Sequence, residues 1–359
     1  MEAKGSFLLL IYWLLFAFFS FGAIVAGEST QGARPLSRLG ALPFLLGMLM
    51  IALLIGLRYK VGADWNNYLF MFRATGLSTL NSALSIGDPG YQLISWVAYQ
   101  FGYRIWAVNL ACGTIFSWGL WRFCRLAPYP WLAVAVAVPY MIIVVAMGYS
   151  RQAVALGILM AGLAAYRHGG SILRFAAYIT VAALFHRTAV VAFPIVALSS
   201  ERNKTMNLLL ALAASVLLYD LFLGDSMDDY VRHYIERRYS SQGAAIRVTM
   251  SLVAAALFWL GGRRFNFGEA ERLVWRNFSV AAIIFAVLLV ASPSSTAVDR
   301  MSIYVMPLQI AILSRIPLAL SPALFGEIIV LAYAGLIEFV WLNFAQFSSY
   351  WIPYRIYPL

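Results

Sequence analysis

Residues 129–166 read YPWLAVAVAVPYMIIVVAMGYSRQAVALGILMAGLAAY, and Arg151 is the one charged residue among them. A helix needs about 20 mostly apolar residues to cross a bilayer, and each half of this stretch approaches that length. Lipid offers no partner for unpaired backbone groups, so only helices and closed barrels cross it, and continuous apolar runs favour helices. The stretch therefore predicts two spanning helices joined by almost no loop at 148–152.

The rest of the chain has the same character. Of 359 residues, 62% are hydrophobic and 11% charged, and the mean hydropathy is +0.79. Soluble domains have about 25% charged residues. The formal charge of +11 comes from 26 basic and 15 acidic residues, and the basic ones stand singly between apolar runs. This composition excludes a soluble globular enzyme, a disordered chain and a nucleic-acid-binding protein.

Working outward, we predict an all-α, polytopic transmembrane bundle of about 12 spans, within a range of roughly 10 to 14, in one integral membrane domain over residues 1–359. We expect 6–26 to be a transmembrane helix, with a cleavable signal peptide as the alternative. The segment between 172 and 200 is two spans or one helix interrupted at His186. The predicted spans are 6–26, 41–57, 103–121, 129–148, 152–166, 172–185, 188–200, 206–223, 244–260, 277–292, 301–317 and 323–344.

Two longer polar connections are expected on the outer face. One is 58–102 and contains a surface helix near 89–101; the other is 224–243, where we interpret the acidic and basic residues as an ion-paired helix rather than a metal site. Total basic counts do not decide orientation. The short, carboxylate-poor connections are richest in clustered arginine, which favours placing them in the cytoplasm and both termini outside.

The first candidate functional segment follows the second predicted span. There the apolar sequence is interrupted by Arg58, Lys60, Gly62 and Asp64. Asp64 is a candidate base for a sugar hydroxyl, and the glycine permits close backbone approach. The alternative is an interfacial aromatic belt with two cations extending to the lipid headgroups.

Two further candidate residues, Arg151 and His186, lie at the ends of predicted spans. Arg151 opens a predicted helix, where a charge is costly unless it meets water or an anion; a structural ion pair is the alternative. His186 precedes Arg187 and can accept a proton near neutral pH, because a neighbouring cation favours neutral imidazole. A histidine satisfied by structural hydrogen bonds is the alternative.

A fourth segment, 292–304, starts a span with Asp299 and Arg300. Asp299 suits a helix N-terminus and Arg300 does not, so another group must hold Arg300 unless the two form an intramolecular pair. Phosphate-binding loops, dinucleotide fingerprints, zinc signatures and cysteine clusters are absent from the sequence. We expect no cofactor and no metal, and any reaction must occur within the bundle or at its mouth.

The order of these motifs resembles the EpsG type of Wzy-like bacterial polysaccharide polymerases. The sequence differs from the family pattern at Ala63, Trp65 and the Arg187-Thr188 pair. The resemblance spans nearly the whole chain and rests on Leu57-Arg58, Val61-Gly62, Asp64, Tyr68, Asp88-Pro89-Gly90-Tyr91, Arg151-Gln152, Phe185-His186, Asp299-Arg300, Tyr304 and Pro353-Tyr354.

The resemblance implies a glycosyltransferase of the bacterial inner membrane with a GT-C-like helical bundle. Members join undecaprenyl-diphosphate-linked oligosaccharide repeat units at the outer face, for exopolysaccharide, capsule or O-antigen. Lipid-linked oligosaccharides and membrane lipids would be its partners, with a flippase and a chain-length regulator as further candidates.

Roles follow for individual residues. Arginine forks suit phosphate oxygens, so we expect them to bind the donor diphosphate in place of a metal, while Asp64 or His186 acts as the base. A lipid-linked glycan ligase, a membrane O-acyltransferase and a lipid-linked sugar transporter or flippase are the alternatives. The diphosphate ligands are predicted to be Arg58, Arg151 and Arg300, supported by Lys60 and Arg187; the orienting residues are Tyr68, Gln152, Tyr304 and Asp299.

Overall fold

A computed structural model describes residues 2–26, 38–167, 171–199, 243–292 and 295–357, with scattered positions between 205 and 216. The described chain is all-helical, as predicted, and its only β pairing is an isolated bridge between Arg58 and Ile356. The predicted span 206–223 and the predicted outer loop 224–243 fall almost entirely outside the described residues.

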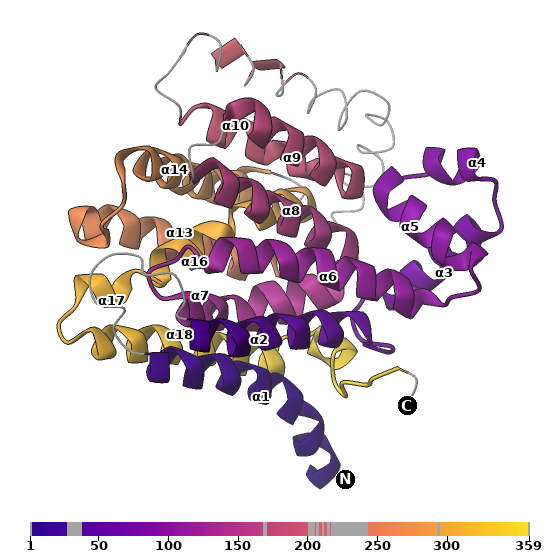
Figure 1. Ribbon diagram of the computed structural model, residues 1–359, viewed down its shortest axis with the longest axis horizontal. Helices are drawn as coiled ribbons and strands as arrows, with labels where there is room; N and C mark the ends of the chain where they lie inside the picture. Colours follow the sequence, from indigo (N-terminus) through magenta and orange to yellow (C-terminus); the bar gives the residue numbers. More distant parts are fainter. Residues whose placement is uncertain are drawn as a thin grey trace.

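The helices follow the predicted apolar segments closely (Figure 1). In the first half they are α1 (Glu2–Ala26), α2 (Arg38–Gly56), α3 (Trp65–Gly76), α4 (Leu80–Ser85), α5 (Pro89–Gln100), α6 (Ile105–Cys124), α7 (Pro130–Ala137) with the π-helical η1 (Val138–Ala146), and α8 (Ser150–Arg167). In the second half they are α9 (Ile172–Phe185), η2 (Arg187–Val191), α10 (Ala192–Ala197), α13 (Ala244–Gly261), η5 (Gly262–Phe265), α14 (Glu269–Ala291), α15 (Ser295–Ser302), η6 (Ile303–Val305), α16 (Pro307–Leu313), α17 (Ile316–Ala319), α18 (Ala323–Phe344) and η7 (Ser348–Tyr350).

Within the described residues, four helical segments have the length and composition to cross a membrane. They are Leu9–Ala26, Ala244–Phe265, Glu269–Ala291 and Ala323–Phe344, and a fifth results if Ser295–Val305 and Pro307–Ala319, bent by 44°, form one span. Shorter apolar helices occupy Ala41–Gly56, Pro130–Ala146, Ile172–Phe185 and Arg187–Ala197. The structure thus has helices long and apolar enough to cross a membrane, and most of the other predicted spans correspond to shorter or broken helices.

α8 is the centre of the bundle. It packs against α6 on one side and α9 on another, and its residues from Gln152 to Ala165 are all buried. A helix that is apolar all round belongs in such a position. Gly119 of α6 meets the backbone of Gly157 so closely that a β-carbon there would overlap it, so small residues allow the two helices to cross.

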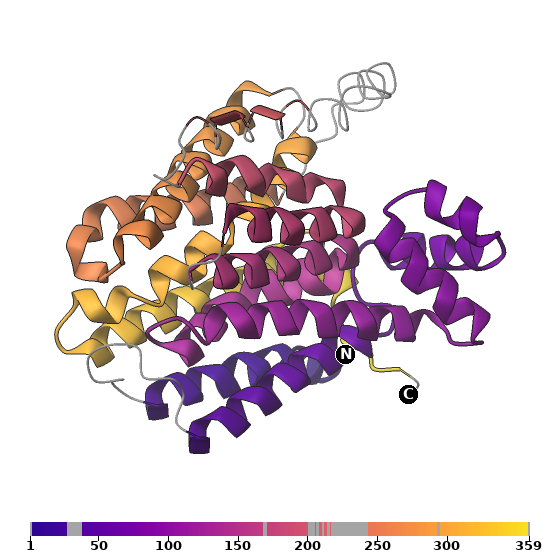
Figure 2. The same ribbon diagram turned by 45° about the horizontal axis from the view of Figure 1, so that its top comes forward.

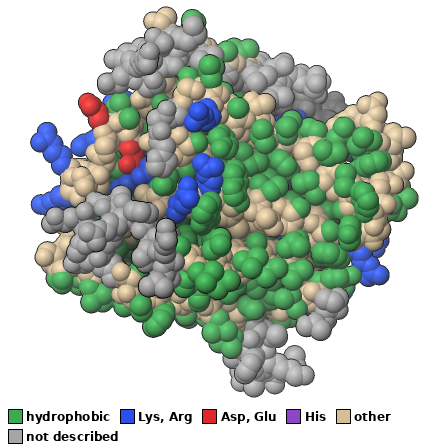
Figure 3. Space-filling model, in the orientation of Figure 1, with side chains coloured by type: hydrophobic (Ala, Val, Ile, Leu, Met, Phe, Trp, Pro, Cys, Tyr) green, Lys and Arg blue, Asp and Glu red, His purple; other side chains and the backbone are tan. Residues whose placement is uncertain are grey.

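α3, α4 and α5 form a separate group beside one end of the bundle (Figures 1 and 2). They occupy the predicted outer-face connection 58–102, and α5 coincides with the helix expected there. The outer surface of the main bundle is broadly apolar, and basic side chains gather toward one end of the face in Figure 3.

The C-terminal segment returns to the same end as α3–α5. The backbone N–H of Tyr59 donates to Arg355 O at 2.8 Å, and that of Gly62 donates to Tyr350 O at 2.9 Å. Gly62 has φ of 101°, and a β-carbon would lie 2.7 Å from Met147 O, so glycine is required here. The segment after α2 is therefore held between η1 and the C-terminus.

Candidate functional site

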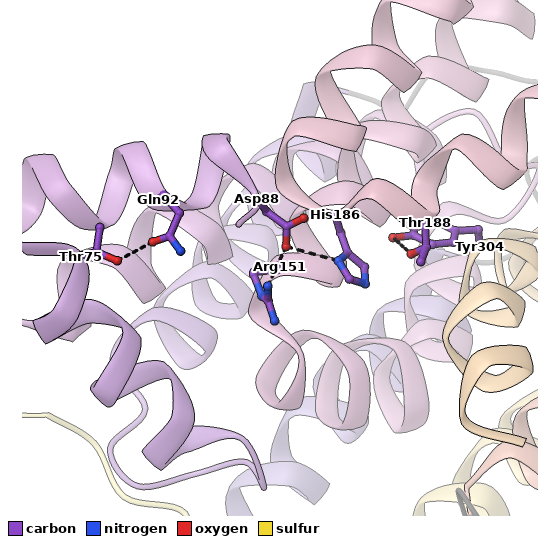
Figure 4. A network of polar contacts seen from close by, with 7 residues as sticks. All are labelled: Thr75, Asp88, Gln92, Arg151, His186, Thr188 and Tyr304. Carbon is purple, nitrogen blue, oxygen red and sulfur yellow. Dashed lines mark hydrogen bonds and ion pairs between the residues drawn. The ribbon is translucent and has the colours of Figure 1, made fainter. Parts of the chain in front are cut away.

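Asp88 is the centre of a polar cluster where α5, α8 and α9 meet (Figure 4). Its Oδ2 accepts a hydrogen bond from Arg151 Nη1 at 2.7 Å and lies 3.5 Å from His186 Nδ1. Asp88 precedes Pro89, which opens α5, and a residue before proline is driven to extended backbone. Its side chain forms no cap bond to α5 and is free to reach the other two helices.

Arg151 lies in the first turn of α8, where the positive end of the helix dipole disfavours a cation. The ion pair with Asp88 compensates for this, and the guanidinium also lies 5.9 Å from the ring centroid of Tyr68. The side chain stays 27% exposed, so part of its donor fork is available to a ligand.

His186 stands in the break between α9 and η2. Its backbone is extended, with φ of −161° and ψ of 111°, and the residue is 8% exposed. Nδ1 faces Asp88, while Nε2 is buried and has no hydrogen-bond partner among the described residues. The prediction that the helical segment is interrupted here is confirmed.

The cluster has a defined charge at neutral pH. Burial lowers the pKa of His186, and the charges of Arg151 and Arg300 lower it further, which together outweigh the raising effect of Asp88. Burial raises the pKa of Asp88, but His186 and Arg151 outweigh it and hold that pKa below its ordinary value. Asp88 is therefore ionised and His186 neutral.

Arg300 and Gln152 bring α15 to this site. Gln152 Nε2 donates to the backbone carbonyl of Arg300 at 3.3 Å, and the side chain of Arg300 is half-buried. Thr188 Oγ1 donates to Tyr304 OH at 3.1 Å, and both residues are buried. Five residues predicted for the site thus come together at one end of the bundle, namely Arg151, Gln152, His186, Arg300 and Tyr304.

Arg58 reaches the same region from the end of α2. Nη2 donates to Ser150 Oγ at 2.7 Å, and Nη1 donates to Ile55 O at 2.5 Å. Ser150 immediately precedes Arg151, so Arg58 is bonded at the α8 N-terminus, next to Arg151. Arg58 is 1% exposed and is anchored more firmly than a surface cation.

The other predicted residues lie at the periphery. Asp64 is half-buried at the N-terminus of α3, and Asn67 Nδ2 lies 3.5 Å from its Oδ1. Lys60 is exposed, with Nζ 5.3 Å from the ring centroid of Tyr59, and the side chain of Arg187 is exposed. Among the described residues, neither Asp64 nor Lys60 is hydrogen-bonded to Asp88, Arg151 or His186.

Asp299 has a different partner from its neighbour Arg300. Its Oδ2 accepts from Arg247 Nη2 of α13 at 2.7 Å, and both side chains are buried. Tyr140 and Tyr149 face the Arg247 guanidinium, each ring centroid 5.6 Å away. Asp299 is thus paired with Arg247, a partner that the sequence interpretation did not name.

Sequence reasoning gave neither Asp88 nor Arg247 a role. The signal for Asp88 is an acid directly before a helix-opening proline, and that for Arg247 is a lone arginine in an apolar helix. Among the described residues, no group of three or more His, Cys, Asp or Glu side chains has the arrangement of a metal site.

The fold and the site define a helical membrane protein with a polar, arginine-rich site at one end of its bundle. The EpsG family profile matches residues 41–356, which is most of the chain. The chain belongs to the EpsG family and is thus a polysaccharide-polymerase-like membrane protein. Comparisons with curated proteins and with solved structures give no match.

Proposed function

We propose that the protein is a polysaccharide polymerase of the bacterial inner membrane. It joins undecaprenyl-diphosphate-linked oligosaccharide repeat units at the outer face, without a metal ion, for exopolysaccharide, capsule or O-antigen. The growing chain is transferred from its lipid diphosphate to a sugar hydroxyl of the incoming unit. We further propose that the complete chain has about 12 spans and a GT-C-like arrangement.

The excess of positive charge around Asp88 carries this proposal. Arg58, Arg151 and Arg300 converge from three separate elements, while Asp88 is the one carboxylate bonded within the cluster among the described residues. Because His186 is neutral and Asp299 is neutralised by Arg247, the site has surplus cations that suit an anionic ligand. Arginine forks bind phosphate oxygens in pairs and stabilise charge as a diphosphate departs.

Two buried aromatic side chains lie beside these cations. The rings of Tyr68 and Tyr91 have centroids 5.6 Å apart, and Tyr68 also faces Arg151. Such surfaces suit the apolar faces of sugar rings, while Gln152 and Tyr304 supply polar groups that orient the ligand.

The opposite end of the bundle supports the orientation. There, Glu271 Oε1 accepts hydrogen bonds from Arg167 and Arg315, each at 3.0 Å. Four more arginines nearby are exposed, namely Arg263 and Arg264 of η5 and Arg272 and Arg276 in the first two turns of α14. Short segments rich in arginine are typical of the cytoplasmic side, which supports the proposal that the Asp88 cluster faces the outer side.

The proposal is tested by reconstituting purified protein in nanodiscs with a lipid-diphosphate-linked repeat unit and EDTA. We expect a product ladder spaced by one repeat unit, and no ladder from Arg151→Ala. An absent ladder with folded protein and intact substrate would overturn the proposal. Transfer to a different glycan acceptor would indicate a ligase, acyl transfer without chain growth an acyltransferase, and movement of intact substrate across the bilayer a transporter.

A further inference from the structure

Resting on the proposed function, the geometry points to Asp88 and His186 as a carboxylate–imidazole dyad. We propose that Asp88 positions the Nδ1–H of His186, and that His186 Nε2 takes the proton from the acceptor hydroxyl. His186 is then the catalytic base and Asp88 a positioning residue. Asp64 has neither role in this scheme.

The hydrogen bond to Asp88 sets the tautomer of the imidazole. Oδ2 of Asp88 lies 3.5 Å from Nδ1 of His186. An ionised carboxylate only accepts hydrogen bonds, so the nitrogen that faces it must carry the proton. With the proton on Nδ1, the lone pair is on Nε2. The contact is long, as catalytic hydrogen bonds commonly are without substrate.

Nε2 is placed for a ligand. It is buried and lacks a hydrogen-bond partner among the described residues, although buried polar atoms are normally satisfied. The backbone of His186 is extended, so neighbouring side chains point to different sides. Arg187 is exposed, while His186 and Thr188 are both buried. A hydroxyl of the acceptor sugar would satisfy the nitrogen as it donates its proton.

Asp88 is poorly suited to be the base itself. Its Oδ2 receives hydrogen bonds from both Arg151 and His186, and its pKa is held below the ordinary value. The groups that face His186 are Asp88 from α5, Arg151 from α8 and Arg300 from α15, beside the Thr188–Tyr304 hydrogen bond. Burial, with a smaller contribution from the two arginines, keeps the imidazole neutral, so it is ready to accept a proton at pH 7.

The proposed step balances. The acceptor oxygen forms a bond to the anomeric carbon of the donor chain as the bond from that carbon to the phosphate oxygen breaks. The bonding pair leaves with the lipid diphosphate, whose charge the arginines stabilise. The hydroxyl proton passes to His186 Nε2 and then to water, and no oxidant or metal takes part.

The test compares pH–rate profiles of chain growth in nanodiscs for wild type, Asp88→Asn and His186→Ala. We expect kcat of the wild type to fall along an acid limb that lies below the ordinary histidine value of about 6.5, since the pKa of His186 is lowered and the imidazole is protonated only at more acidic pH. His186→Ala should lose about 10²-fold or more in kcat, together with this acid limb, and added imidazole should restore part of the rate. Asp88→Asn should lower kcat more than it raises the donor KM and move the acid limb to lower pH, because the carboxylate raises the pKa of His186.

Glu271→Gln is the matched control, because Glu271 is likewise a carboxylate held in ion pairs, here with Arg167 and Arg315, but lies at the opposite end of the bundle. It should leave the acid limb in place. A ladder from the wild type with an unchanged limb in Asp88→Asn and no imidazole rescue of His186→Ala would overturn the dyad alone. Loss of the limb in Asp64→Asn would assign the base to Asp64, and failure of the wild type to form a ladder would contradict the proposed function instead.

Discussion

Arg151 Nη1 lies 2.7 Å from Asp88 Oδ2, although the two residues are 63 positions apart in the chain. The pair joins the start of α5 to the start of α8, and so attaches the α3–α5 group to the centre of the bundle. It also leaves other donors of the Arg151 fork free to meet a ligand at the mouth.

Replacing Arg151 with lysine should reduce chain growth by about 10-fold to 10²-fold, because a point charge cannot bond Asp88 and a phosphate with a planar fork. Measuring the rate of ladder formation with saturating acceptor checks this. Arg174→Lys, which changes an exposed arginine at the start of α9, is the control and should grow chains at the wild-type rate. Equal rates for the two variants would remove Arg151 from the diphosphate site.

The protein should lose stability in mild acid. The folded pKa of His186 is lowered, so between that value and about 6.5 the unfolded chain binds a proton that the folded chain does not. Stability is therefore lost as the pH falls below about 6.5. The lowered pKa of Asp88 adds a loss at more acidic pH, below its ordinary value of about 3.9.

Thermal unfolding in detergent between pH 7 and pH 5 checks the first effect. The midpoint should fall less in His186→Gln than in the wild type. Parallel pH dependence of both proteins would show that His186 does not titrate in this way.

The Arg247–Asp299 pair should behave as a coupled unit. Arg247→Gln or Asp299→Asn alone breaks the buried ion pair and should cost about 3–5 kcal/mol of stability. The double variant should cost less than the sum of the two, and a double-mutant cycle of unfolding midpoints measures the difference. Additive losses would mean that the 2.7 Å contact contributes no coupling.

Gly119→Ala should destabilise the bundle, because the added β-carbon would meet the backbone of Gly157 and separate α6 from α8. Gly268→Ala is the matched control, since a β-carbon there has nothing within 4 Å. Thermal unfolding of the two variants should differ by at least several degrees. Equal midpoints would contradict the close crossing.

The helical fold could be predicted because apolar length is a local property of the chain. The positions of Arg151 at a helix start and His186 at a helix break are local for the same reason. Asp88 could not be recognised as their partner, because nothing within its own segment reports a contact with residues 63 and 98 positions away. Asp88 comes directly before Pro89, and an acidic residue in that position is also common at helix starts that have no functional role.

Asp64 shows the converse. Its aromatic and basic neighbours make the segment conspicuous, yet folding places it at the start of α3 with Asn67 rather than beside His186. The ion pair of Arg247 could not be predicted either, because a lone arginine in an apolar helix does not indicate which carboxylate it will contact. In both cases the missing information is how helices distant in sequence pack together.

The most direct test is to count products with a donor labelled in both its diphosphate and its sugar. Wild-type protein in nanodiscs should release one lipid diphosphate for each glycosidic bond formed, in the presence of EDTA, and Arg151→Ala should do neither. Bond formation without diphosphate release, or transport of the intact donor with no bond formed, would contradict the account.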